Sequence, residues 1–551
     1  MSASYSYPGI YIQELPLSAH TITPAPTSIA AFVGYAHPWK TPPANFNTAI
    51  QLFSFSDYEA NFGGLYTSGM ISSDLARAVY EFFLNGGTNA YVVALQPNAY
   101  EITASGLISL GTFGLGSGMI SATAQIIPDS SNATAGMLVT SLEPVDMVPM
   151  TVTVSNIRVA SPPPAGSPVY NTFDMVISYG TRIETYRNLG IGASSGTAPD
   201  KAINGISSLI SIAPITTGGS LGTSFAGGSA TSAPPPISVT PALTGLPGTF
   251  ATSFSAADFI GGAGAPGPFD TDSSLDKVEI FNLLLVPGVA DNSVISAALA
   301  FAERKRAFTI LDPPQNAPAA GSGSIDTLMT SFPMSQNGAL YFPYLLSTDP
   351  VTSNPIAMAP SGYVAGVYAA TDTSRGVWKA PAGIGTPLLD TVGPVATGVM
   401  NDMRQGVLNN ASVNCLRQFN SIGTVVFGAR TLVSANQAFA QSKYVPVRRM
   451  TLFIEQTLIA NLKWVVFEPN DEPLWLAIRT SIEAFLLSLF NQQALQGSTP
   501  SQAFQVKCDA TTTTSSDQQN GIVNIVIGVA LLKPAEFVVI KIAQIAGQTA
   551  G

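Results

Sequence analysis

The chain has 551 residues, which is long for one core and predicts three or four compact units at about 150 residues per domain. Charged residues make up only 10% of it, against roughly a quarter in typical domains, so we expect much of its surface to meet other protein. The net charge of −10 and the lack of a basic run argue against nucleic acid as a partner, because phosphate binding needs clustered Lys and Arg.

The sequence also argues against a membrane span and a disulfide framework. The most apolar run, Ile522 to Leu532, contains Asn524 and ends at Lys533, whereas a bilayer-spanning helix needs about 20 apolar residues. The opening MSASYSYPG lacks the basic patch and apolar stretch of a secretory signal. Cys415 and Cys508 are expected to be buried thiols in a reducing compartment.

Residues 1–25 are predicted to form an extended N-terminal arm. Pro8 and Gly9 break a helix, whereas Ile10, Tyr11 and Ile12 favour a strand. No segment precedes this strand for local pairing.

Alternating strand and helix signals follow and predict a discontinuous α/β middle domain of residues 26–100 and 271–394. The signals run strand, helix, strand in each block, at 29–35, 74–84 and 91–95, then at 280–286, 294–304 and 307–311. Such alternation indicates a layer of parallel strands with helices, interrupted by an insertion.

The insertion, residues 101–270, is rich in Gly, Ser, Thr, Ala and Pro but contains strand signals. Met150, Val152 and Val154 alternate with polar residues, and the segments 173–179 and 182–186 flank Gly180-Thr181 like a hairpin. We expect a small, variable β-rich domain on flexible connections.

Residues 395–551 are predicted to form an α+β C-terminal domain with one long amphipathic helix followed by strands. Asn470 and Asp471 are candidate N-caps with Pro473 in the first turn, and apolar residues recur at helical spacing from Leu474 to Leu489. Strands are expected at 522–532 and 537–542. This segment contains 11 Lys and Arg and 9 Asp and Glu, for a net +2, whereas the rest of the chain has a net −12. Either the segment faces an acidic partner or the difference is accidental.

The residues needed for catalysis, cofactor binding or metal binding are not arranged in any strong motif. His20 and His37 lack metal-ligand spacing and are expected to be ordinary polar residues. Residues 218–222 have nucleophile-elbow spacing without a preceding strand or a following His. Residues 262–267 have dinucleotide-binding spacing, but Pro266 and Pro268 disrupt the helix start that would hold a pyrophosphate. We therefore predict no enzyme activity, no cofactor and no metal.

Short segments spread over most of the chain carry a recognisable pattern. They include YPGIYIQEL at 7–15, TSIAAFVGYA at 27–36, FFLNGGTNAYVV at 82–93, PSGYVAGVYAATDTSRGVWKAPAG at 360–383, VRRMTLFIEQTL at 447–458, VFEPND at 466–471 and KPAEFVVIKI at 533–542. In order and spacing these segments resemble the contractile phage tail sheath family, which includes the sheaths of R-type pyocins and extracellular contractile injection systems. Gly383 stands where the family's motif usually has Asn, which affects loop detail.

The resemblance implies a structural subunit that polymerises helically around an inner tube in a metastable extended state and contracts to drive the tube through a target envelope. The implied partners are further copies of the chain, the inner tube protein, and baseplate and terminator or cap proteins, with no nucleic acid and no direct membrane insertion. Assembly would occur in the bacterial cytoplasm, and the product would be a phage virion or phage-tail-like particle, released or membrane-anchored. A non-contractile surface or capsid-like shell protein is the alternative, which negative-stain images would separate from a sheath.

Two sets of residues are expected to mediate assembly. The terminal strands would add to sheets of neighbouring subunits, although both could instead complete a sheet of their own domain. We also expect the C-terminal domain to face the inner tube, with the insertion outside. The terminal strands comprise Ile10, Tyr11, Ile12, Phe537, Val538, Val539, Ile540, Lys541 and Ile542, and the candidate tube-facing residues are Lys463, Glu468, Asp471, Glu472 and Arg479.

Overall fold

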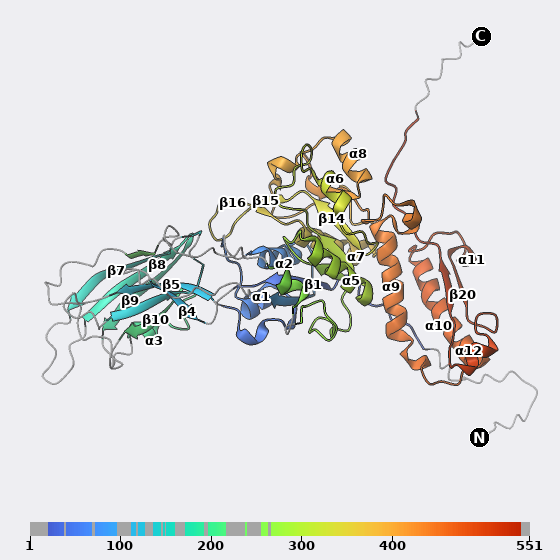
Figure 1. Cartoon of the computed structure of the whole chain (residues 1–551), viewed down its shortest axis with the longest axis horizontal. Helices are drawn as coiled ribbons and strands as arrows, with labels where there is room; N and C mark the ends of the chain where they lie inside the picture. Colours follow the sequence, from blue (N-terminus) through green and yellow to red (C-terminus); the bar gives the residue numbers. More distant parts are fainter. Residues whose placement is uncertain are drawn as a thin grey trace, which may run out of the picture. The chain divides into compact units, whose positions relative to one another are not determined.

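The computed structural model has a mixed α/β fold with several sheets (Figure 1). The chain divides into two compact units, described separately here: the central unit, Pro26–Arg449, and the terminal unit, Met1–Ala25 with Met450–Gly551. The structure describes residues 20–37, 40–68, 72–95, 112–116, 119–126, 136–144, 147–148, 150–159, 171–191, 197–215, 237–239, 255–262 and 266–541.

An eight-stranded sheet forms the centre of the central unit. Its six inner strands are parallel, and an antiparallel strand closes each edge. Strands β1 and β13 are buried at every position, as expected for parallel strands covered on both faces. In sheet order the strands are β19 (Gly423–Val426), β18 (Val413–Phe419), β14 (Gly338–Phe342), β13 (Phe308–Leu311), β12 (Leu283–Leu285), β1 (Ala30–Tyr35), β3 (Ala90–Leu95) and β2 (Ala49–Leu52).

Most of the predicted α/β elements are confirmed. Helix α2 (Asp74–Leu84) has the predicted bounds, and α5 (Asn292–Lys305) extends the predicted helix slightly at both ends. Strand β12 is shorter than predicted. The remaining elements of this part are η1 (Pro43–Asn45), α1 (Phe55–Phe62), α4 (Ala256–Ile260), α6 (Ile325–Leu328), η2 (Met329–Ser331), β15 (Leu345–Thr348), β16 (Pro355–Met358), α7 (Ser361–Arg375), β17 (Gly393–Pro394), η3 (Ala396–Gly398), α8 (Asp402–Asn410) and η4 (Gln437–Ser442).

Helices α2 and α7 pack unusually closely because α7 presents glycines to α2. A Cβ atom at Gly366 would lie 2.6 Å from Cβ of Asn85 and 2.8 Å from the carbonyl oxygen of Phe82. A Cβ atom at Gly362 would lie 2.6 Å from Cα of Ala78. Gly362 and Gly366 are therefore required by the packing of these two helices.

The insertion forms two four-stranded antiparallel sheets around their own apolar core. The predicted hairpin is confirmed as β8 (Asn171–Tyr179) and β9 (Arg182–Ile191), and Met150 begins β7 (Met150–Val159). The other elements are β4 (Thr112–Gly116), β5 (Met119–Ile126), β6 (Gly136–Ser141), α3 (Pro199–Ile203), β10 (Ile210–Ile215) and β11 (Ile237–Val239).

The terminal unit contains two long helices where the sequence predicted one. Helix α9 (Val445–Asn461) enters this unit at Met450, and α10 (Glu472–Asn491) begins after the predicted N-cap, Asp471, whose carboxylate accepts a hydrogen bond from the Glu472 amide at 2.8 Å. The rings of Phe453 and Phe485 lie 6.2 Å apart between the two helices. The remaining elements are η5 (Lys463–Val465), α11 (Pro500–Ala503), β20 (Phe504–Lys507), α12 (Ser515–Gln519) and β21 (Val526–Val529).

The predicted domain boundary at residue 395 is wrong, because β18 pairs with β14 and so extends the sheet of the central unit. The boundary between the units lies at Met450. Residues 395–449 contain six Lys and Arg and one Asp, whereas residues 450–551 contain five Lys and Arg and eight Asp and Glu. The excess of Lys and Arg counted over residues 395–551 thus comes from residues 395–449, which lie in the central unit, and the terminal unit has a net negative charge.

Helix α10 is also long and apolar enough, by length and composition, to cross a membrane, which the sequence analysis did not expect. A buried core helix passes the same test. Eight side chains of α10, from Leu474 to Leu489, are buried within the terminal unit, so we interpret α10 as a core helix.

Candidate functional site: assembly surfaces and a polar joint

Residues 537–541 are exposed and belong to no strand in the described part of the chain. Phe537 is 73% exposed, Val538 is 81% exposed, and Val539 and Ile540 are each 79% exposed. Lys541 is also exposed. Four consecutive β-forming side chains therefore lie in solvent. Ile542 and the predicted N-terminal strand, Ile10 to Ile12, lie outside the described residues.

The terminal unit also contains a sheet of only two strands. Strands β20 and β21 are antiparallel, with Phe504 opposite Val529 and Lys507 opposite Val526. Within the described residues, neither strand has a second strand partner. The pair packs against α10, and Leu495 forms an isolated bridge with Leu531 just beyond β21. The outer edge of an unpaired strand presents N–H and C=O groups to any strand that approaches.

The turn between α9 and α10 brings together four of the five predicted tube-facing residues. Lys463, Glu468, Asp471 and Glu472 are all exposed within this short segment. Arg479 lies apart from them: its guanidinium donates to the carbonyl oxygen of Cys508 at 3.1 Å, which gives it a local structural contact. The turn therefore has three carboxylates and one ammonium group.

Phe467 is the most unusual residue of this turn. It is 102% exposed, and its φ of +73° is in the left-handed region. For a residue with a side chain this conformation costs about 1–2 kcal/mol. Phe467 is not among the five predicted tube-facing residues, although the turn from Phe467 to Glu472 as a whole is a predicted contact with the tube.

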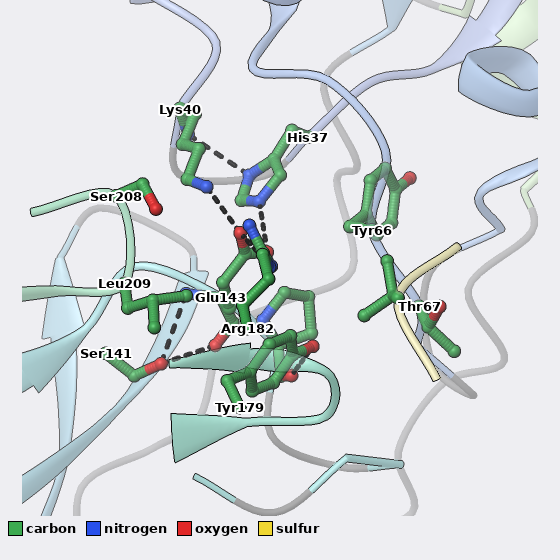
Figure 2. Close-up of polar contacts among 12 residues, drawn as sticks. His37, Lys40, Tyr66, Thr67, Ser141, Glu143, Tyr179, Arg182, Ser208 and Leu209 are labelled. Atoms are coloured by element: carbon green, nitrogen blue, oxygen red, sulfur yellow. Dashed lines mark hydrogen bonds and ion pairs between the residues drawn. The ribbon is translucent and has the colours of Figure 1, made fainter. Parts of the chain in front are cut away.

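A buried polar cluster joins the insertion to the α/β layer of the central unit (Figure 2). Glu143, which follows β6, is fully buried. Its carboxylate lies 3.0 Å from Nε2 of His37 and 2.7 Å from the guanidinium of Arg182, and it also accepts a hydrogen bond from Lys40 Nζ. His37 follows β1 and Arg182 begins β9, so this carboxylate ties together three parts of the central unit.

The ionisation of this cluster follows from its contacts. Burial alone would raise the pKa of Glu143, but the hydrogen bond from His37 and the charges of Lys40 and Arg182 lower it to about 2. Burial lowers the pKa of His37 below its ordinary 6.5. The backbone N–H of Lys40 donates to His37 Nδ1 at 3.2 Å, which assigns the proton of the neutral imidazole to Nε2 and aims it at Glu143.

The sequence analysis missed this joint. His37 was expected to be an ordinary polar residue, yet it is fully buried against a carboxylate. The only local signal was a charged residue, Glu143, in a segment with few charges. The other histidine, His20, stacks on Trp464 with ring centroids 3.9 Å apart.

No group of three or more His, Cys, Asp and Glu side chains in the described part of the chain could hold a metal ion. Cys415 and Cys508 are free and buried, as predicted. The nucleophile-elbow match at 218–222 lies outside the described residues, as do 263–265 of the dinucleotide-like segment.

Residues 435–545 match the family described as the phage tail sheath C-terminal domain. A putative prophage major tail sheath protein of Pseudomonas aeruginosa (strain UCBPP-PA14) is 27% identical over 252 residues, which cover 44% of this chain and 61% of that protein. The tail sheath protein of Vibrio phage KVP40 is 28% identical over 151 residues, which cover 27% of this chain and 21% of that protein.

Among solved structures, the sheath complex of an extracellular contractile injection system, PVC, in its contracted state has a TM-score of 0.55 and 19% identity, covering 98% of this chain and 99% of that one. At this identity the likeness shows the fold alone. The matches to the two curated relatives span about three fifths and one fifth of their lengths.

Proposed function

We propose that this chain is a tail sheath protein of the kind found in phages and phage-like contractile injection systems. Many copies polymerise helically around an inner tube and contract to drive that tube through a target envelope. In this proposal the chain is a structural subunit without enzyme activity. Its partners are other copies, the tube protein, and baseplate and terminator or cap proteins at the two ends. Assembly occurs in the bacterial cytoplasm.

The observation that carries the proposal is the combination of an exposed β-forming segment and an incomplete sheet in one unit. Phe537 to Ile540 have four exposed apolar side chains, and among the residues that the structure describes β20 and β21 pair only with each other. Adding this segment to an open edge of a neighbour would satisfy main-chain groups on both partners. Burial of each large apolar side chain would contribute about 1.5–3 kcal/mol.

Such donated strands explain how one chain type makes a long tube. The donating segment and the accepting sheet are different surfaces, so each contact is heterologous and leaves a free donor and a free acceptor for further copies. The N-terminal strand, Ile10 to Ile12, is proposed as a second donor for the other open edge. Tethers of this kind would hold copies together while the folded units change their packing during contraction.

The tube is proposed to contact the acidic turn between α9 and α10. Glu468, Asp471 and Glu472 are exposed there. Because the terminal unit is acidic rather than basic, the complementary tube surface is expected to carry Lys and Arg.

A proline scan of the C-terminal segment tests the strand donation. Val539→Pro removes one backbone N–H and should prevent pairing, whereas the matched Val539→Thr keeps both the N–H and a β-branched side chain. We expect purified Val539→Pro and a chain truncated before Phe537 to remain folded monomers, and Val539→Thr to form striated hollow tubes in negative-stain images. Tubes of normal length from the proline variant and the truncated chain would refute strand donation.

A further inference from the structure

Phe467 lies in the turn between α9 and α10 with its ring fully in solvent. The preceding residue, Val466, is 62% exposed. Together they form an apolar knob, residues 466–467, most of whose apolar area remains in water in the isolated chain.

The backbone of Phe467 is also in a conformation that its side chain disfavours. Ten non-glycine residues in the described part of the chain have positive φ, and Phe467 is the only apolar one among them. Polar residues such as Asn adopt this region more readily because their side chains bond locally. The other nine are Asn47, Asn156, Asn188, Asp272, Arg306, Ser353, Asp390, Ser412 and Gln493.

The turn is anchored on both sides of the knob. Before it, Trp464 stacks on His20, and the Glu468 amide donates to the carbonyl oxygen of Val465 at 3.2 Å. After it, Asn470 accepts from the indole of Trp475 at 2.8 Å and donates to the carbonyl oxygen of Ile522 at 3.0 Å. The strained conformation is therefore imposed by the surrounding fold, and the ring is presented at a defined place.

The chemistry around the knob restricts the kind of partner. The same turn exposes the three carboxylates of Glu468, Asp471 and Glu472 and the ammonium group of Lys463. A complementary surface has an apolar pocket for the ring and basic side chains around the pocket.

We propose that Phe467, supported by Val466, is the apolar anchor by which each subunit holds the inner tube. This inference rests on the proposed function and deepens it, because it names the residue and the chemistry of the tube contact. The tube subunit supplies an apolar pocket bordered by Lys or Arg, and Glu468, Asp471 and Glu472 contact its rim.

The backbone strain provides a test that separates binding from folding. Phe467→Gly and Phe467→Asn remove the ring and relieve the left-handed strain, so both variants should melt at the wild-type temperature or above it. Phe467→Tyr keeps an aromatic ring. The matched control is Phe53→Asn, which removes another exposed phenylalanine, 63% exposed in the central unit.

Binding is measured by co-sedimentation of each purified full-length chain with tubes polymerised from the tube protein of the same genome. We expect Phe467→Gly and Phe467→Asn to bind at least tenfold more weakly, and Phe467→Tyr and Phe53→Asn to bind like the wild type. Glu468→Lys should weaken binding and reduce its salt dependence.

Wild-type tube binding by both Phe467→Gly and Phe467→Asn would overturn the inference, as would a lower melting temperature for both. If these variants bound tubes normally but failed to polymerise alone, the knob would contact a second copy of the chain, and the tube assignment would be wrong. Failure of the wild-type chain itself to bind tubes would instead refute the proposed function.

Discussion

Glu143 is the residue on which the joint between the insertion and the α/β layer depends. It is fully buried, and Lys40 and Arg182 supply the positive charge around it. We expect Glu143→Gln to destabilise the central unit by about 2–3 kcal/mol, less than the 3–5 kcal/mol of a fully buried pair because both cations reach solvent in part. Chemical denaturation measures the loss, and hydrogen exchange should locate it at β6 and β9.

The matched control for this change is Asp402→Asn, which removes an ion pair at the surface. Asp402 lies 3.0 Å from Arg417, but its side chain is 96% exposed. We expect no measurable effect on stability because solvent screens such pairs. Equal denaturation midpoints for the two variants would show that the Glu143 joint contributes little.

The same cluster predicts a pH dependence. The pKa of His37 is lowered from 6.5 in the folded state, so the unfolded state binds more protons as the pH falls below that value. The contribution of neutral His37 to the free energy of unfolding is present above about pH 6.5 and is lost as the pH falls below it. Protonation of Glu143 lowers the free energy of unfolding further between pH 4.5 and about pH 2. Hydrogen exchange in β6 should therefore be faster at pH 5 than at pH 7, after correction for intrinsic rates.

His37→Gln provides the control for the pH effect, because glutamine keeps a hydrogen-bond donor without titrating in this range. In this variant, protection of β6 should no longer change between pH 7 and pH 5. A wild-type joint with the same protection at both pH values would contradict the assignment.

The crossing of α2 and α7 restricts the size of the side chains that can lie between the two helices. A methyl group at Gly366 would lie 2.8 Å from the Phe82 carbonyl oxygen, so one helix must shift. We expect Gly366→Ala to destabilise the central unit by about 1–3 kcal/mol through overpacking. Thermal unfolding of the full-length chain measures the change.

Helix α8 offers the matched glycine. A Cβ atom at Gly406 would meet nothing within 4 Å, and this residue lies inside the helix. Gly406→Ala should therefore stabilise the chain by about 0.5–1 kcal/mol, since alanine loses less conformational entropy. If Gly366→Ala and Gly406→Ala changed the free energy of unfolding in the same direction, the packing argument would be wrong.

The sequence predicted elements whose signals are local. Helix α2 has the predicted bounds, 74–84, and α10 was predicted from its N-cap candidates and its apolar stripe. Helix α9 was missed as a separate element because apolar residues occur on several of its faces, so it lacks a clear stripe.

What could not be predicted depends on tertiary contacts. The domain boundary was misplaced because the pairing of β18 with β14 joins residues far apart in sequence. Glu143 contacts His37 and Arg182, which lie far from it and from each other in the sequence, so no spacing rule connects them. The exposure of Phe467 depends on a left-handed backbone that the sequence does not signal.

For the whole molecule, the central claim is that copies exchange strands through the terminal unit. The isolated chain leaves Phe537 to Ile540 in solvent, and in the described part of the chain neither β20 nor β21 has a second strand partner. The claim gives the apolar segment a place to be buried and gives the two-stranded sheet a further strand.

A cryo-electron microscopy map of the assembled sheath tests this claim most directly. The account predicts that the backbone of residues 537–541 of one subunit is hydrogen-bonded along an outer edge of β20 or β21 in a neighbouring subunit. A map in which this segment folds back onto its own subunit, or in which both edges remain open in the assembled sheath, would contradict it.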